Sequence, residues 1–272
     1  MILSWCLFLI VGAASGFIAG LLGLGGGVII VPMLSLVFIG LDIDPDLAHR
    51  LAVGTSLASI MFTAASSARK HNQFRPLDWK AILPMAPSLV IGTLCGSFLS
   101  ALLPVLVLRI IFLVFLVGLA IRLSLFSREP ESAHKVSPVV MAVCGFLIGM
   151  LASIVGIAGG VILVPFMLWI GLPMHGAIGA ASMLGVFVAL SGTAGAVVNG
   201  LIKGGLPPGT IGYVHIEALA GVVLAGIFTA PLGARTAHKL SPGKLRLIFG
   251  VVMLLMAAGM AWNTVGDILR SG

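Results

Sequence analysis

The sequence predicts an all-α polytopic membrane protein made of two inverted repeats of about five helical segments each, with short broken helices after glycine-rich loops. Hydrophobic residues make up 60% of the 272 residues and charged residues only 8%, whereas soluble domains carry about 25% charge. Apolar runs long enough to cross a bilayer as helices recur along the whole chain. Two similar glycine clusters interrupt these runs.

Each half of the chain divides into five apolar segments. The first is interpreted as a retained span and not a signal peptide, because it lacks a basic start and resembles residues 143–150. The expected segments cover residues 3–22, 27–40, 51–68, 81–102 and 106–126, then 137–156, 160–171, 176–198, 212–233 and 245–264. The sequence thus predicts a first membrane repeat over 1–126, a cytoplasmic linker over 127–136, and a second membrane repeat over 137–272.

The two halves contain similar motifs in the same order. The run G-F-I-A-G at 16–20 corresponds to G-F-L-I-G at 145–149. Each run is followed by a glycine cluster and then by V-I-I-V-P or V-I-L-V-P, which end at Pro32 and Pro165. Internal repeats of this kind are typical of secondary transporters.

The distribution of basic residues predicts that the two repeats are inverted, because Lys and Arg favour the cytoplasmic side. With ten passes, eleven basic residues fall on the predicted cytoplasmic side: Arg69, Lys70, Arg75, Lys80, Arg122, Arg128, Lys135, Arg235, Lys239, Lys244 and Arg246. The other side keeps Arg50, Arg109, Lys203 and Arg270. If the short segments were re-entrant, leaving eight passes, nine basic residues would lie on the cytoplasmic side and six on the other side. We therefore expect a multi-pass membrane protein with ten passes and both termini outside.

The glycine clusters have two interpretations. Residues 27–40 and 160–171 are too short to cross a bilayer comfortably, so each looks like a half-length helix that opens from a glycine cluster. A helix N-terminus offers unpaired N–H groups and the positive end of the helix dipole, and glycine lets a ligand approach, which together make an anion cradle. Alternatively, both clusters are tight turns where helices pack closely. Spacing alone leaves both interpretations open.

Hydroxyl side chains follow one face of the third segment. The face consists of Thr55, Ser59, Thr63 and Ser66. The corresponding face in the second half has fewer hydroxyls, on Ser182 and Thr193, with Ala189 between them. Such hydroxyls either line a hydrophilic path or bond to carbonyls of their own helix.

Four motifs occur together over nearly the whole chain. They are G-F-I-A-G-L-L-G-L-G-G-G-V-I-I-V-P at 16–32, A-V-G-T-S at 52–56, H-N-Q-F-R-P-L-D-W at 71–79 and P-L-G-A-R-T-A-H-K-L-S-P-G-K-L-R at 231–246. In combination they resemble the TauE/SafE sulfite-exporter family of membrane permeases. The resemblance implies a multi-pass secondary transporter of the plasma (inner) membrane, for a small anion such as sulfite, a sulfonate or a related organic anion. We expect it to work by alternating access around the paired helix N-termini.

The resemblance and the hydroxyl face together give the expected substrate-binding residues. They are Gly23, Gly25, Gly26, Gly27, Pro32, Thr55, Ser56, Ser59, Gly156, Gly159, Gly160, Pro165 and Ser182. The second half departs from the pattern, because Ala158 stands where the first half has Gly25 and the run Ala180-Ala181-Ser182 replaces a Thr-Ser pair. The second cradle is therefore expected to be drier and tighter.

A few ionisable residues are candidates for coupling. Glu217 follows His215 near the start of the ninth segment, which allows proton coupling, although an interfacial position is the favoured interpretation. His71, in a basic loop, is expected to be solvated. Three pairs are interpreted as a helix cap followed by a first-turn proline: Asp44-Pro45, Ser137-Pro138 and Ser241-Pro242. Asp44 is therefore interpreted as a cap and not as a metal ligand.

Other classes of function lack the residues that they need. An intramembrane enzyme requires a nucleophile with a base or a set of metal ligands, whereas five of the six histidines are expected in loops. A cation or metal carrier would place carboxylates or thiolates in the spans, but Cys6, Cys95 and Cys144 are scattered. We therefore expect no enzyme activity, cofactor, metal or nucleic-acid partner. The expected partners are a small anion and the lipid bilayer, and small-residue helix faces also allow a homodimer.

Overall fold

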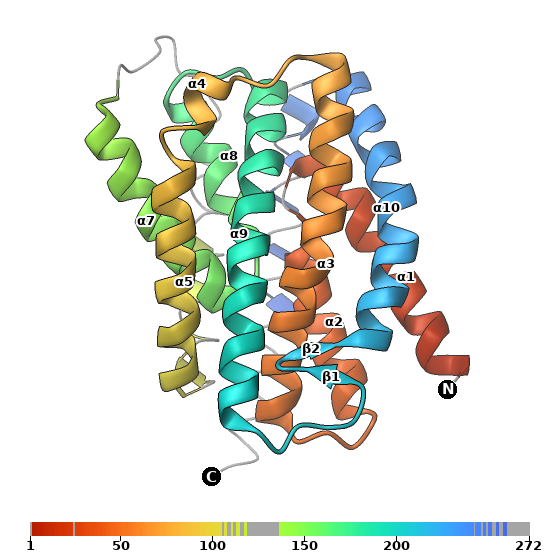
Figure 1. Ribbon diagram of the computed structural model, residues 1–272. Coiled ribbons are helices and arrows are strands. Elements are labelled where there is room, and N and C mark those ends of the chain that lie inside the picture. The colour runs from red at the N-terminus through yellow and green to blue at the C-terminus, as the bar shows by residue number, and fades with distance from the viewer. Residues whose placement is uncertain are drawn as a thin grey trace.

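The computed structural model describes residues 2–23, 25–104 and 136–241, together with scattered residues within 106–118 and 243–259. The described part is a bundle of long helices (Figure 1), and five of its helices are long and apolar enough to cross a membrane. This confirms the predicted all-α polytopic class. The elements are α1 (Ile2–Leu22), α2 (Gly27–Ile39), α3 (Pro45–Phe74), α4 (Trp79–Ile82), α5 (Ala86–Leu102), α7 (Pro138–Val155), α8 (Gly160–Trp169), α9 (Met174–Lys203), β1 (Thr210–Ile211), β2 (Val214–His215) and α10 (Ile216–Lys239). The expected segments 106–126 and 245–264 and the linker 127–136 lie largely outside the described residues.

Local sequence signals fix several helix starts. The Asp44 carboxylate accepts hydrogen bonds from the N–H groups of Asp46 and Leu47, both at 3.1 Å, and Pro45 opens α3. Ser137 accepts from the Val140 N–H at 3.3 Å ahead of Pro138. These are the predicted cap-plus-proline starts. The corresponding pair at 241–242 includes a position outside the described residues.

The expected segment at 81–102 is divided in the structure. Residues 79–82 form the single turn α4, and α5 begins only at Ala86. Pro84 and Pro87 explain the break, because proline lacks an N–H and disfavours helix in the residue before it. The transmembrane part of this segment is therefore shorter than the apolar run.

The helices α2 and α8 are half-length. They contain 13 and 10 residues, or about 20 and 15 Å at 1.5 Å per residue, against a hydrocarbon core of about 30 Å. Both helices are shorter than this core, as the sequence predicts, and the choice between ten and eight passes stays a prediction. Each follows a glycine loop: residues 23–26 form the first glycine loop and residues 156–159 the second.

The long helices α3 and α9 pack side by side and antiparallel at the centre of the bundle (Figure 1). A Cβ added at Gly192 would lie 3.0 Å from Leu57, and Ser67 Oγ lies 3.1 Å from Ser182 Oγ. The residue number thus rises along α3 as it falls along the facing part of α9. An inverted repeat requires this arrangement of its two third helices; the repeat itself stays a prediction.

Glycines bring the outer helices together in two parallel pairs, α1 with α10 and α5 with α7. A Cβ added at Gly16 would lie 2.6 Å from the Gly226 Cα, and one added at Gly96 would lie 2.8 Å from the Met150 Cα. Backbones approach this closely only where side chains are absent. These small-residue faces are occupied within one chain, so the homodimer stays a prediction that does not rest on them.

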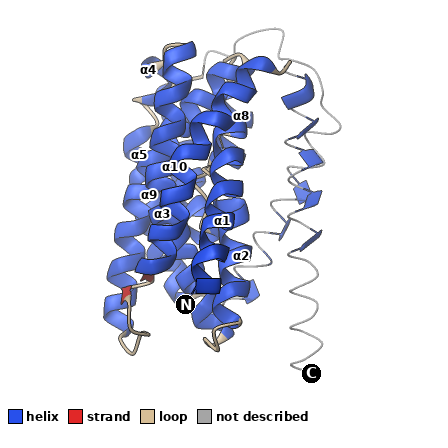
Figure 2. Ribbon diagram, turned by 90° about the vertical axis from the view of Figure 1, so that its right-hand side faces the viewer, coloured by secondary structure: helices blue, strands red, loops and turns tan. Residues whose placement is uncertain are grey.

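The bundle has two distinct ends. At the first, called the hairpin end, the short strands β1 and β2 pair, and the rings of Phe38 and His215 lie 5.1 Å apart. At the opposite end, called the histidine end, α3 finishes beside His238 of α10, whose ring is 5.1 Å from that of His71. Figure 2 shows the strands at one end and α4 at the other. The helix α1 runs to the histidine end and α2 returns to the hairpin end.

Candidate functional site

The two glycine loops meet in the middle of the bundle. A Cβ added at Gly27 would lie 2.7 Å from the Gly156 carbonyl oxygen, and one added at Gly25 would lie 2.6 Å from the Ala158 Cβ. Both added atoms would also lie 2.8 Å from the side chain of Ile60, halfway along the 30-residue helix α3. The starts of α2 and α8 are therefore neighbours at about the mid-depth of the bundle.

Both half-helices present uncapped N-termini to this region. Gly26 and Gly159 occupy the N-cap positions with φ of 81° and 70°, and neither helix start has a side-chain cap. Left-handed backbone of this kind favours glycine. The first N–H groups of a helix have no partner within the helix, and they carry the positive end of its dipole. The loops that carry these two helix starts are in contact.

The first glycine loop is covered by protein in this conformation. A Cβ added at Gly26 would lie 2.8 Å from the Ser15 carbonyl oxygen. The Thr63 hydroxyl approaches the Gly25 carbonyl oxygen at 3.4 Å, and Ile60 fills the space in front of the loop. A ligand cannot reach this loop without a movement of α1 or α3.

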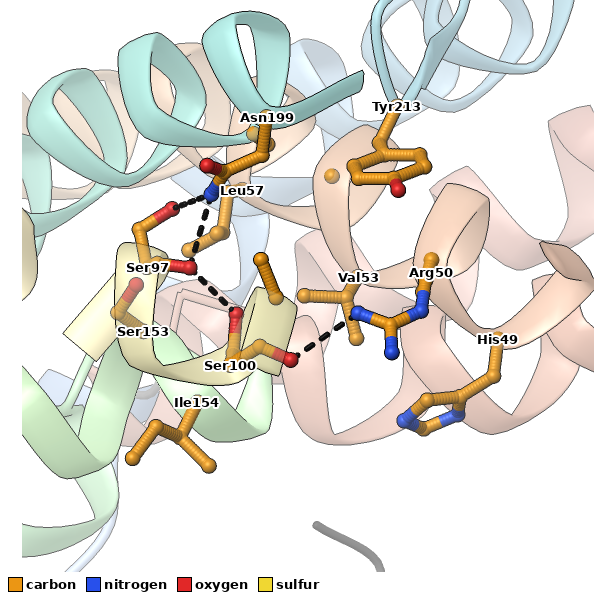
Figure 3. A pocket seen from close by; sticks show the side chains of 13 residues that line it. His49, Arg50, Val53, Leu57, Ser97, Ser100, Ser153, Ile154, Asn199 and Tyr213 are labelled. Carbon is orange, nitrogen blue, oxygen red and sulfur yellow. Dashed lines mark hydrogen bonds between the residues drawn. The ribbon is translucent and has the colours of Figure 1, made fainter. Parts of the chain in front are cut away.

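A small cavity of about 30 Å³ lies between α3, α5, α7 and α9, beside the second glycine loop (Figure 3). Ser153 and Ile154, from the last turn of α7, line it. Val53 lines it as well, and its methyl groups lie 3.0 Å from the position of a Cβ on Gly156. The lining includes Arg50 and contains no Asp or Glu. The cavity is therefore positively charged, and it holds a few water molecules at most.

Arg50 is held in place by the end of α5. Its guanidinium donates to the Ser100 carbonyl oxygen at 3.0 Å and to the Leu103 carbonyl oxygen at 3.2 Å. Carbonyl groups at a helix C-terminus carry the negative end of the dipole, so they stabilise this cation. A guanidinium has five N–H donors in a fixed plane, and these two bonds set its orientation at the cavity wall (Figure 3).

Polar side chains line the cavity beside Arg50. The Ser153 hydroxyl is buried and has no hydrogen-bond partner among the described residues, a state that costs about 1–3 kcal/mol. The Asn199 amide donates to the Ser97 carbonyl oxygen at 2.8 Å, which fixes its orientation. Burial raises the pKa of the Tyr213 hydroxyl, while the charge of Arg50 opposes this shift. Tyr213 therefore keeps its proton at neutral pH and remains a hydrogen-bond donor.

The structure brings one predicted hydroxyl to a glycine loop. The Ser56 hydroxyl donates to the Gly156 carbonyl oxygen at 3.0 Å and ties α3 to the second glycine loop. Thr55 instead accepts from the His215 N–H at 2.9 Å, and Ser59 donates to the Thr55 carbonyl oxygen at 2.7 Å. The Ser59 bond is of the kind that the alternative interpretation of the polar face describes, whereas the Thr55 bond joins α3 to β2.

The other predicted residues lie around the two loops at different distances. Ser182 bonds Ser67 on the side of the loops toward the histidine end. Gly23 starts the first loop, with its N–H donating to the Ala19 carbonyl oxygen at 2.9 Å. Gly160 is buried at the start of α8. Pro32 and Pro165 lie inside α2 and α8, beyond their first turns.

The predicted coupling pair lies at the hairpin end. His215 caps α10, with its Nδ1 accepting from the Ala218 N–H at 3.4 Å, and Glu217 is exposed in the first turn. Burial lowers the pKa of His215, and the nearby Glu217 carboxylate partly opposes this shift. Both positions fit the end of a span. A role in coupling stays a prediction.

The expectation for the histidines is wrong. His71 is not solvated: only 1% of its surface is exposed, and it lies inside α3. His49, His175 and His238 are also helical. The helices α3, α9 and α10 extend beyond the apolar runs that define the expected segments, so they take in residues assigned to loops.

Sequence reasoning also missed Arg50 as part of a site. Its contacts with Ser100 and Leu103 join positions about fifty residues apart, which no local motif reveals. One signal was present. Arg50 is one of only four basic residues assigned to the outer side, and it directly precedes the apolar part of the third segment.

A multi-pass helical bundle with two broken helices that meet at mid-depth is the architecture of membrane transporters that use helix termini to bind ions. Residues 8–260 match the family model described as sulfite exporter TauE/SafE. The chain belongs to this family.

Similar proteins carry transporter names. A probable membrane transporter protein of Haemophilus influenzae is 33% identical over 93% of this chain and 97% of its own length. Proteins of the same description from Methanocaldococcus jannaschii and Bacillus subtilis are 28% and 26% identical, over 93% and 97% of this chain and 94% and 99% of their own lengths. No solved structure matches the chain. The protein is thus a membrane transporter and not an enzyme.

Proposed function

We propose that this transporter carries a small anion, such as sulfite, a sulfonate or a related organic anion, by alternating access around the paired N-termini of α2 and α8. The observation that supports this proposal most strongly is the cavity beside the second glycine loop. It contains Arg50 and no carboxylate, and it holds a buried hydroxyl, on Ser153, that has no partner among the described residues.

The proposed path offers an anion one hydrogen-bond donor or positive charge after another. A guanidinium binds oxyanions through paired N–H groups. Beyond Arg50, the Ser153 hydroxyl lies in the last turn of α7, three residues before Gly156. Under this proposal the path continues from Ser153 past Gly156 to the N-terminus of α8, where an anion is stabilised by up to about 2 kcal/mol in partly buried sites. An anion that enters between α3 and α5 therefore meets donors or positive charge at each step.

The described conformation fits one of the two states that alternating access requires. The cavity lies between mid-depth and the hairpin end, whereas helices are joined by hydrogen bonds at the histidine end. The first glycine loop is covered in this state and the second borders the cavity. The second state would uncover the loops toward the histidine end.

A thermal-shift screen of the detergent-purified protein tests which anion binds. Sulfite, sulfate, sulfoacetate, taurine and simple carboxylates are compared, because a ligand that binds the folded state raises the apparent melting temperature. An anion that raises it is then tested for saturable uptake into proteoliposomes. No shift and no uptake with any of these anions would contradict the proposal.

Replacing Arg50 tests the site itself. We expect Arg50→Gln to reduce anion uptake at least tenfold and Arg50→Lys to reduce it less, since lysine keeps the charge but loses the planar pair of donors. Arg69→Gln is the matched control, because Arg69 is an exposed arginine near the other end of α3. Melting temperatures of all variants are measured, since Arg50 also caps α5. Normal uptake by a folded Arg50→Gln protein would exclude this cavity as the site.

A further inference from the structure

Three histidines from three helices gather at the histidine end. His71 Nδ1 of α3 lies 3.1 Å from His238 Nε2 of α10. The ring of His175, from the first turn of α9, stacks on His238 with centroids 4.9 Å apart and planes 19° apart. The Phe74 ring lies 4.5 Å from the same imidazole. We call His71, His175 and His238 the histidine cluster.

The hydrogen bonds assign the protons of this cluster. His71 Nε2 lies 2.8 Å from the Gly20 carbonyl oxygen. A carbonyl oxygen only accepts, so His71 carries its proton on Nε2, and its Nδ1 must accept from His238 Nε2–H. His175 Nε2 likewise donates to the Ala237 carbonyl oxygen at 3.1 Å. All three imidazoles can be neutral in this arrangement with every one of these bonds satisfied.

Extra protons do not suit this closed arrangement. A proton added to His71 Nδ1 would require His238 to change tautomer so that its Nε2 accepts, and it would place a cation on a ring that is only 1% exposed. A proton added to His238 Nδ1 would keep that bond, but it would place a cation against the stacked His175 ring. In water, by contrast, histidine takes up a proton near pH 6.5, its ordinary pKa being about that value.

The charged groups around the cluster also disfavour protons. The Lys70 ammonium lies 5.2 Å from the Phe74 ring, which covers His238, and Lys239 follows that histidine directly. The helix α1 contributes the Gly20 carbonyl and no ionisable side chain within its last turn. The other charged or titratable residues in the adjoining helix ends and connections are Arg69, Arg75, Asp78, Lys80, Arg235 and Lys244. Asp78 is the one carboxylate in this set, and it caps α4.

The cluster joins helices that would have to separate for the glycine loops to open at this end. The Gly20 carbonyl that accepts from His71 belongs to the last turn of α1, just before the first glycine loop. One turn earlier on α3, the Ser67 hydroxyl lies 3.5 Å from the Ala19 carbonyl oxygen and 3.1 Å from Ser182 Oγ. The helices α1, α3, α9 and α10 are thus connected through one set of bonds.

We propose that the histidine cluster is a proton-binding gate, in which protonation of His71 and His238 opens the histidine end and couples proton movement to anion movement. This inference rests on the proposed anion transport. The closed end binds fewer protons than the separated, hydrated histidines of an open end. By linkage, a falling pH therefore stabilises the open end and a rising pH stabilises the closed end. The coupled ion is a proton, and its site is at the opposite end of the bundle from the Arg50 cavity.

Proteoliposomes that contain a pH-sensitive dye test the coupling, with the anion found in the thermal-shift screen. In the unaltered protein, we expect an anion gradient to move protons, and anion uptake to change several-fold between pH 7.5 and 5.5, with a midpoint near the titration of histidine. We expect His238→Gln to lose at least four-fifths of the anion-driven proton flux and to show little dependence on pH. The glutamine amide can still donate to His71 but does not titrate.

Anion binding by His238→Gln, followed by thermal shift, should stay within twofold of that of the unaltered protein. His215→Gln is the matched control at the hairpin end and should keep the pH dependence. If His238→Gln folds poorly, His71→Gln is measured in its place.

Two results would overturn the gate: pH-independent anion uptake by the unaltered protein, or unchanged proton coupling in the folded cluster variants. Loss of coupling in His215→Gln instead would move the proton site to the hairpin end and also overturn it. Failure of the proposed function looks different, because no anion would then shift the melting temperature or enter the vesicles at any pH.

Discussion

The two glycine loops are similar in sequence but differ at their third residue. The first has Gly25 where the second has Ala158, and these two positions face each other: a Cβ added at Gly25 would lie 2.6 Å from the Ala158 Cβ. Two methyl groups do not fit in that space. The substitution in the second half is therefore compatible with the contact only because the first half keeps glycine.

The loops also differ in what surrounds them. The second loop is expected to be drier, and that stays a prediction. Its residues are buried, with Ser153 and Ile154 just before it lining the Arg50 cavity, while Ser15 and Ile60 cover the first loop. The Ser56 hydroxyl donates to the carbonyl of Gly156 in the second loop. The described residues of both loops are thus buried in this conformation, and different neighbours cover them.

The largest effect is expected from Gly25→Ala. The new methyl group would meet Ala158 and also Ile60 at 2.8 Å, and the residue has a φ of 70°. Overpacking and left-handed backbone together should destabilise the protein by about 3 kcal/mol or more. Thermal unfolding in detergent measures the change.

The double variant Gly25→Ala, Ala158→Gly sharpens the comparison. It moves the methyl group from one loop to the other, so we expect it to recover part of the lost stability. The φ of residue 25 and its contact with Ile60 remain unfavourable. A double variant that is no more stable than Gly25→Ala would show that the two loops do not constrain each other.

A smaller effect is expected from Ser153→Ala, with Ser35→Ala as its control. Both hydroxyls are buried and have no partner among the described residues, but only Ser153 lines the Arg50 cavity. We expect Ser153→Ala to weaken anion affinity several-fold, because it removes a donor from the second-loop side of the path. Concentration-dependent uptake measures this affinity. Equal affinities in the two variants would argue against a ligand at Ser153.

The smallest expected effect is the difference in stability between Ser56→Ala and Ser59→Ala, two substitutions on α3. Ser56→Ala removes the bond to the second loop, and it should cost about 1 kcal/mol because the Gly156 carbonyl loses a buried donor. Ser59→Ala removes a bond to its own helix, at Thr55, and should cost less, since such bonds stabilise helices little. Thermal unfolding of the two variants gives the comparison. A larger loss for Ser59→Ala would reverse the assignment.

Sequence reasoning predicts the parts of this protein that depend on local chemistry. The apolar runs gave the spanning helices, Asp44 and Ser137 gave helix starts, and the glycine clusters gave the half-length helices. The ends of α3 and α9 were missed, because helices continue past the apolar core into polar sequence such as the run around His71.

The tertiary sites were not predictable in the same way. Arg50 meets the end of α5, and His71 meets His238 across 167 positions of sequence. No spacing rule joins residues so far apart. The packing of α3 on α10, and of both α3 and α5 on α9, brings them within hydrogen-bond distance.

The glycine-lined pairs have a consequence for how this protein can move. The helix α1 is packed on α10, and α5 on α7, so each close pair takes one member from either half of the chain. Helices of the two halves therefore alternate in the bundle, and neither half can move as a separate rigid body. We expect the moving units to be the pair α1 and α10 and the pair α5 and α7, which would slide past the central α3 and α9. A half of the chain expressed alone would expose its glycine-lined helix faces to lipid.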